Sequence, residues 1–277
     1  MKTYIPVVIG ALFLSWSTKA QVGIAPAAVF INGRGVGSTT IMNTGAVSME
    51  VGISFQFGYP DELPDGGLMM VYDDTVRKLK YALDGMIRAY PKSFTLPPGG
   101  KQIVRMQVRP PGDAQPGVYF TRVKVSSQQQ LADIGEGDPA EGLATQINMR
   151  FEQVVAAFYK SGSVSTGIEV TKLHSRCLDQ QLNLEYDFKR TGNAPFLGNL
   201  ITEVLKANDE VVLRYSRPVA LYFDGSRKLG FQLGEKKMEA GTYSVRLTFT
   251  TERSDIDPAE IVAAHPYIYQ DQIVIPE

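Results

Sequence analysis

The sequence predicts an all-β protein made of two tandem immunoglobulin-like β-sandwich domains. Apolar and polar residues alternate with a period of two along many short runs, as in strands that bury one face. Gly, Pro, Asn and Asp residues bound these runs. A similar order of runs and turns occurs in both halves of the chain, which favours two sandwiches over one.

The clearest strands of the first half lie at residues 104–109 and 119–125, which alternate and are rich in β-branched and aromatic residues. Residues 69–86 leave two interpretations open. They fit either one short helix or a pair of strands joined by a charged turn at Asp73 and Asp74.

Two segments look like connections. Residues 128–141 are polar and acidic and contain Gly and Pro, so we expect a long mobile loop inside the first domain. Residues 161–163 (Ser-Gly-Ser) form a short joint of small residues. We therefore expect the domains to comprise residues 21–161 and 162–277.

The two halves share their turn residues. Residues 41–46 interrupt two strand-like runs in the first half, and residues 190–194 do so in the second. Tyr119 and Tyr243 each follow a Gly at the start of a late strand. We expect both tyrosines to hydrogen-bond back to the preceding chain at a sandwich corner.

The N-terminal residues 1–20 have the features of a cleaved signal peptide, which predicts export and a mature chain that begins at Gln21. The apolar run at residues 5–16 is too short to span a bilayer, and no later segment is apolar enough. The lone Cys177 cannot form an internal disulfide, and we expect it to be a small buried hydrophobic residue.

Composition and motifs argue against nucleic-acid binding and catalysis. The net charge is −1, from 28 basic and 29 acidic residues, and the basic residues do not cluster. His174 and His265 are the only histidines, and neither has the spacing of a metal ligand or a catalytic base. We expect no catalytic site, no metal site and no cofactor, and hence a protein that is not an enzyme.

The most specific segment is residues 89–125. It reads as a strand, a Pro-Pro-Gly-Gly turn, an alternating strand with Arg105, a Pro/Gly turn and a strand that starts at Gly117. Together with residues 26–30, 42–45 and 155–160, this order resembles the PapD-like periplasmic pilus chaperones, and it looks closest to their divergent, archaic-type branch. The resemblance is clearest over residues 22–160.

The resemblance implies two immunoglobulin-like domains set as an L, without a cofactor. It implies a periplasmic chaperone for secreted, β-rich pilus-type subunits that lack a strand, and an outer-membrane usher as a further partner. The chaperone lends the last strand of its first domain to the subunit, which is a case of β-strand addition.

The candidate donor strand begins at Thr145. Alternation places three large apolar residues on one face and three polar residues on the other: Ile147, Met149 and Phe151, against Asn148, Arg150 and Glu152. Alternation alone leaves open whether the apolar face fills a client or the protein's own core. The resemblance favours the client.

The sequence departs from the family at the residues that anchor the client's C-terminal carboxylate. The expected Arg and Lys fall on Ala27 and Ala156, which carry no charge. Arg34, Arg150 and Lys160 are the candidate replacements. Two other functions remain open: a structural or adhesive immunoglobulin-like protein of the cell envelope without chaperone activity, and an accessory module that binds carbohydrate or peptide.

Overall fold

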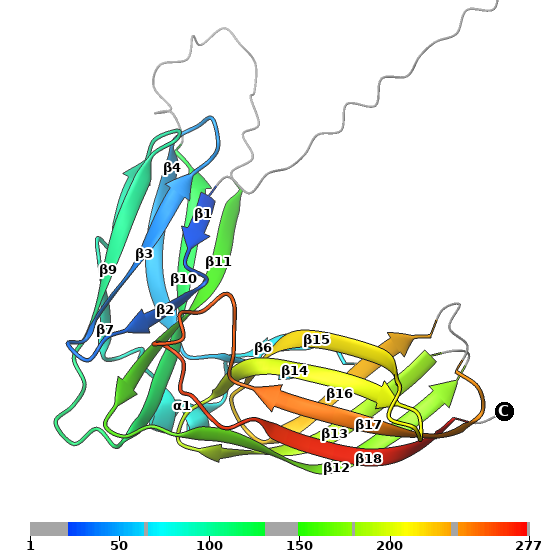
Figure 1. The fold of residues 1–277 in the computed structure, drawn as a ribbon. Coiled ribbons are helices and arrows are strands. Elements are labelled where there is room, and N and C mark those ends of the chain that lie inside the picture. The colour runs from blue at the N-terminus through cyan, green and yellow to red at the C-terminus, as the bar shows by residue number, and fades with distance from the viewer. Residues whose placement is uncertain (1–21, 64–65, 131–148, 179–180, 234–237, 276–277) are drawn as a thin grey trace, which may run out of the picture.

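The computed structural model describes residues 22–63, 66–130, 149–178, 181–233 and 238–275. Its strands form two β-sandwiches, and the described residues include one short helix. Figure 1 shows the first sandwich upright and the second lying across its foot, so that the two form an L. The predicted all-β fold of two tandem sandwiches is therefore confirmed.

The first sandwich packs a sheet of order β1-β3-β9-β7 against a sheet of order β2-β11-β10-β4-β8. A separate hairpin, β5–β6, and the helix α1 lie between β4 and β7 in the chain. The elements are β1 (Val22–Ala25), β2 (Ala28–Ile31), β3 (Val36–Asn43), β4 (Met49–Gln56), β5 (Tyr59–Glu62), β6 (Leu68–Val71), α1 (Thr75–Tyr81), β7 (Ile87–Tyr90), β8 (Ser93–Leu96), β9 (Lys101–Val108), β10 (Gly117–Gln129) and β11 (Arg150–Ser161).

The second sandwich packs a sheet of order β12-β13-β16 against a sheet of order β15-β14-β17-β18. Its strands are β12 (Thr166–Leu178), β13 (Gln181–Gly192), β14 (Phe196–Leu205), β15 (Val211–Leu221), β16 (Gly225–Gln232), β17 (Gly241–Thr250) and β18 (Tyr267–Ile275). All the strand pairs described in this sandwich are antiparallel.

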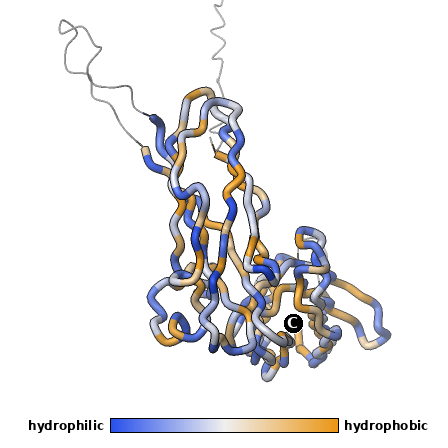
Figure 2. The backbone as a smooth tube through the Cα atoms, turned by 90° about the vertical axis from the view of Figure 1, so that its left-hand side faces the viewer, coloured by the Kyte–Doolittle hydropathy of each residue, from blue (hydrophilic) through white to orange (hydrophobic). Residues whose placement is uncertain are grey.

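Each sandwich has its own hydrophobic core, and a third buried cluster joins them. The cores come from the alternating strands, which appear in Figure 2 as orange and blue segments along the tube. The third cluster contains Phe57, Phe120 and Phe158 from the first sandwich and Tyr222 from the second. The rings of Phe120 and Tyr222 lie 4.7 Å apart, so the junction is packed like a core.

The predicted tyrosine corners are confirmed in both domains. The Tyr119 hydroxyl donates to the carbonyl of Gln115 at 3.1 Å, and the Tyr243 hydroxyl donates to the carbonyl of Glu239 at 3.0 Å. Each bond ties the start of a late strand to the turn before it.

The link between the sandwiches is held by Asn193. Its side-chain amide donates to the carbonyls of Pro116 at 3.1 Å and Ser163 at 3.0 Å, and its side-chain oxygen accepts from the backbone of Ser165 at 2.9 Å. The preceding Gly192 has φ +81°, and a Cβ there would lie 2.3 Å from the Ser165 carbonyl oxygen. The turn thus fixes the joint of small residues to both domains.

The strand pairs and the helix boundaries decide two expectations about local structure. Residues 69–86 contain both a strand and a helix, since β6 pairs with β5 and α1 begins at Thr75, after the N-cap Asp74. The first residues of the expected loop are not a loop, because Gln128 and Gln129 belong to β10. Gln128 pairs with Arg150, and its side-chain amide donates to Glu50 at 2.8 Å. The rest of the expected loop, from residue 131, lies outside the described residues.

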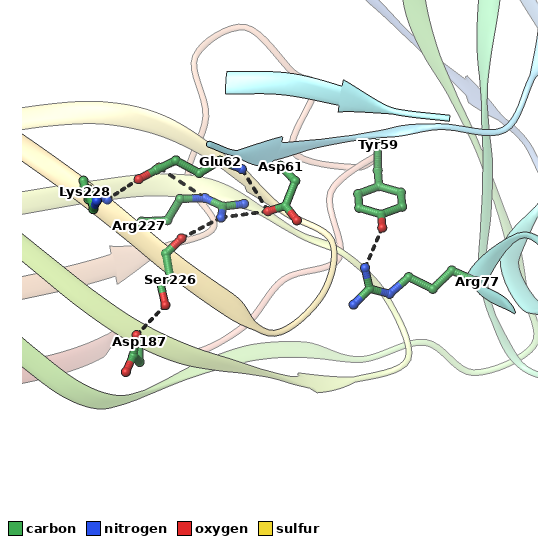
Figure 3. Close-up of polar contacts among 8 residues, drawn as sticks. All are labelled: Tyr59, Asp61, Glu62, Arg77, Asp187, Ser226, Arg227 and Lys228. Carbon is green, nitrogen blue, oxygen red and sulfur yellow. Dashed lines mark hydrogen bonds and ion pairs between the residues drawn. The ribbon is translucent and has the colours of Figure 1, made fainter. Parts of the chain in front are cut away.

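The β5–β6 hairpin reaches from the first sandwich onto the edge of the second (Figure 3). The Arg227 guanidinium lies 3.1 Å from Asp61 and 3.7 Å from Glu62, and Glu62 also accepts the backbone N–H of Lys228. The side chains of Arg227 and Glu62 are 7% and 5% exposed. Burial raises the pKa of Glu62, while its hydrogen bond from Lys228 and the charge of Arg227 act in the opposite direction.

Candidate protein-binding edge

Among the described residues, no strand pairs with the outer edge of the upper half of β11. β10 pairs with β11 along its length on one side, but on the other side β2 pairs only with residues 156–159. In the described part of the chain, no strand covers the outer edge from Arg150 to Val155. Figure 1 places this edge on the side of the first sandwich from which the second extends.

The direction in which each backbone N–H and C=O group points at this edge follows from the strand pairing. The N–H of Ala156 points outward, because it donates to the carbonyl of Ala27 at 3.4 Å. Successive residues of a strand alternate in direction, and the register with β10 is continuous. The N–H and C=O groups of Arg150, Glu152 and Val154 therefore face outward, ready to pair with an added strand.

Large apolar side chains lie exposed beside these backbone groups. Met149 is 61% exposed, Phe151 is 49% exposed and Val154 is 39% exposed. An unpaired strand edge with exposed apolar side chains invites pairing with another chain. This combination is the feature of the first sandwich best suited to bind a protein segment.

The surroundings of the alternating face change along β11. The face that carries Phe151 continues through Val155, Ala157 and Tyr159, which contact or form the core of the first sandwich. Above them the side chains of Phe151 and Met149 emerge into solvent. Thr145 and Ile147, the other predicted donor residues, lie outside the described residues.

The three candidate carboxylate anchors are not brought together. Arg34 is exposed in the turn between β2 and β3. Arg150 is exposed at the start of β11, whereas Lys160 lies at its foot beside Phe158 and Glu260. Ten residues of extended strand span roughly 33 Å, so Arg150 and Lys160 cannot hold the same carboxylate.

A different basic residue, Arg122, lies next to one of the positions where the resemblance expects a cation. Arg122 on β10 lies directly across from Ala156 in the strand register, and Ala156 is one of the two positions where the resemblance expects a basic residue. Because the N–H of Ala156 points away from β10, this is a non-hydrogen-bonded pair, in which side chains lie closest.

The Arg122 side chain is buried, and only some of its hydrogen-bond donors have a partner among the described residues. It is 8% exposed, its Nε donates to the carbonyl of Gly58 at 2.9 Å, and its guanidinium lies 5.2 Å from the ring centre of Tyr222. Its Nη2 is buried and has no hydrogen-bond partner among the described residues. No acidic side chain forms an ion pair with Arg122 within the described ranges.

The electrostatics of this junction favour an incoming anion. Burial raises the pKa of Tyr222, and the neighbouring Arg122 acts in the opposite direction. The next basic residue on β10, Lys124, is paired with Glu152 at 3.0 Å. A buried guanidinium with an unused donor costs free energy unless a partner arrives.

Sequence reasoning missed Arg122 because alternation assigns it only to the polar face of its strand. Its burial depends on Tyr222, a residue of the other domain about a hundred positions later in the chain. Two basic residues, Arg122 and Lys124, alternate with valines in this strand, and nothing in that pattern distinguishes the buried one from the other.

The remaining candidates for chemistry do not assemble into a site. His174 lies exposed on β12, His265 is exposed near β18, and Cys177 is a free, partly buried thiol that packs against the second core. Among the described residues, no group of three His, Cys, Asp or Glu side chains is placed to hold a metal ion. Over the same ranges, no helix has the length and hydropathy needed to cross a membrane.

No family model matches the sequence, and no curated protein matches it. Solved structures similar to the chain include the YadV chaperone, at 9% identity and a TM-score of 0.46, covering 92% of this chain and 100% of that one. A second is a chain from the complex of the Salmonella enterica SafA pilin with the SafB chaperone, at 12% identity and a TM-score of 0.42, covering 91% and 98%. A third comes from the CsuC–CsuE chaperone–tip subunit complex of Acinetobacter baumannii, at 13% identity and a TM-score of 0.40, covering 91% and 98%.

Proposed function

We propose that the protein is a periplasmic chaperone that captures secreted, β-rich pilus-type subunits by donating the strand that contains β11. The observation that carries the proposal is the unpaired upper edge of β11, flanked by the exposed side chains of Met149 and Phe151. The proposed donor residues are Thr145, Ile147, Met149 and Phe151. A structural or adhesive role would not require such an edge.

Binding by this edge has two parts. The outward N–H and C=O groups of Arg150, Glu152 and Val154 pair with a strand of the subunit and supply general affinity. The apolar side chains fill the space left by the strand that the subunit lacks. Each large side chain that becomes fully buried contributes about 1.5–3 kcal/mol.

Arg122 is the proposed carboxylate anchor. It lies across from Ala156, close to where β2 stops covering β11, and its Nη2 has no hydrogen-bond partner in the described ranges. A C-terminal carboxylate that reached this guanidinium would satisfy the unused donor with a charge-assisted hydrogen bond. The anchor would then sit on β10, in place of the basic residues expected at Ala27 and Ala156.

The proposal is tested by capture from the cell envelope. The tagged mature protein should co-purify with a small β-rich exported subunit in an equimolar complex. Arg122→Gln should weaken this complex about tenfold or more, since a charge-assisted hydrogen bond is lost. Arg122→Lys keeps the charge but loses the planar fork, so capture should fall less.

The matched control is Lys101→Gln on β9, which removes an exposed cation from the other sheet and should leave capture unchanged. Thermal denaturation of each variant checks that the first sandwich remains folded. Capture by Arg122→Gln at the wild-type level would contradict the role of Arg122. The absence of any equimolar subunit would contradict the chaperone function itself.

Export and domain organisation complete the proposal. Residues 1–20, the proposed signal peptide, lie outside the described residues. The intact mass of the mature protein should match a chain that begins at Gln21. A mass that includes Met1 would contradict cleavage. We place the domain boundary at residues 161–162, where β11 ends before β12 begins. An outer-membrane usher is the proposed acceptor of the loaded subunit.

A further inference from the structure

The second sandwich has an open side between its edge strands β15 and β16. These strands end their respective sheets, and the rings of Tyr215 and Phe231 meet across the gap at 5.6 Å. A cavity of about 620 Å³ lies here, lined by residues of β12, β13, β15 and β16 and by Gly66 of the β5–β6 hairpin. We call this cavity the lateral cleft.

Basic residues outnumber acidic residues in the lining of the lateral cleft. Arg176, Arg217 and Lys228 line it together with His174, whereas Glu185 is the one acidic residue among its described lining residues. The Nε atom of Arg217 is buried and finds no hydrogen-bond partner in the described part of the chain. Such a surface is complementary to an anionic group.

The backbone edge beside the cleft is available for pairing. The N–H of Lys228 points outward from β16, because it donates to the Glu62 carboxylate of the hairpin. The register with β13 is continuous, so the N–H and C=O groups of Gly230 and Gln232 point the same way. In the described part of the chain, no strand pairs with β16 on this side.

Gly230 leaves room for the approach of another backbone. A Cβ at this position would meet its nearest neighbours, Asn183 and Gln181, only at 3.4 Å, in ordinary contact. Glycine in a strand often marks a place where another backbone comes close.

The neighbouring part of the same edge already binds carboxylates. Glu62 accepts from Lys228 and lies 3.7 Å from Arg227, and Asp61 lies 3.1 Å from Arg227 (Figure 3). The hairpin therefore demonstrates, within this chain, how an acidic extended segment engages β16 from outside the second sandwich.

We propose that the lateral cleft docks an extended, acidic segment of a partner protein. The segment pairs with β16 at Gly230 and Gln232 and places a carboxylate on Arg217. This site is separate from the edge of β11, and it does not depend on the proposed chaperone function.

The test uses a labelled synthetic peptide of about nine residues, the length of a long strand, that alternates Val and Glu. Its counterpart has Gln in place of every Glu. Fluorescence anisotropy should show saturable binding of the Glu peptide and binding of the Gln peptide that is weaker by about tenfold or more. Arg217→Gln should weaken binding of the Glu peptide to a similar extent, whereas Lys189→Gln, an exposed cation of β13 outside the cleft, should not.

Residue-resolved amide hydrogen exchange on the wild-type protein gives a second readout that does not require a variant to fold. The Glu peptide should slow exchange at Gly230 and Gln232. Equal binding of the two peptides, unchanged binding by a folded Arg217→Gln variant, or protection at Glu152 and Val154 instead would overturn the proposal.

Discussion

The double variant Met149→Asp, Phe151→Asp is expected to lose subunit capture while the free protein remains folded. The two side chains are 61% and 49% exposed, so the charges stay in water and the stability change at each site should be within about 0.5 kcal/mol. In a complex the same charges would enter an apolar groove. Losing the burial of two apolar side chains alone would weaken the binding free energy by about 3–6 kcal/mol, which corresponds to more than a hundredfold in affinity.

Two control substitutions separate this outcome from general damage. Ile103→Asp changes a residue that is 64% exposed on β9, in the other sheet, and should affect neither stability nor capture. Val123→Asp places a charge in the core at a fully buried position and should unfold the first sandwich. If the double variant melted like Val123→Asp, Met149 and Phe151 would belong to the core and the donor-strand assignment would fail.

Arg227→Ala is expected to destabilise the protein by about 3–5 kcal/mol, because it leaves the buried Glu62 carboxylate without its guanidinium partner. Urea denaturation measures the change. Arg214→Ala is the matched control. Arg214 is 65% exposed in its pair with Glu203, and Glu203 keeps Arg246 at 3.4 Å, so the loss should stay within about 1 kcal/mol.

Combining Glu62→Gln with Arg227→Met distinguishes loss of an ion pair from loss of packing. Removing both charges avoids an isolated buried ion, so much of the stability should return. If Arg227→Ala cost no more than Arg214→Ala, the hairpin would not fasten the two sandwiches through these ion pairs.

Alternation along the chain predicts much of the fold, because burial of one strand face is a local property. It identifies the strands around Val104, Val123 and Val245, all fully buried, and the turn residues predict both tyrosine corners. The same signal cannot show at which residue the apolar face of a strand becomes exposed. Phe151 and Val155 therefore look alike in sequence, although one is exposed and the other contacts the core.

Local sequence patterns do not predict the contacts between the two domains. Asp61 and Arg227 are separated by 166 positions in the chain, and the segment that contains Asp61 has the Pro and Gly residues of an ordinary turn. Arg122 owes its burial to the second domain in the same way. The family resemblance, added to the alternation from Thr145, favours the donor-strand interpretation, whereas the position of Arg122 across from Ala156 follows only from the strand register.

The most direct test of the central proposal is residue-resolved amide hydrogen exchange along β11, in the free protein and in the complex with a captured subunit. Strand addition should slow exchange of the outward amides of Arg150, Glu152 and Val154 by about tenfold or more, because each gains a backbone partner. The amides of Phe151 and Gln153 already face β10 and should change less. Unchanged exchange at the three outward amides in a stable complex would show that the subunit binds elsewhere, and would contradict donation of this strand.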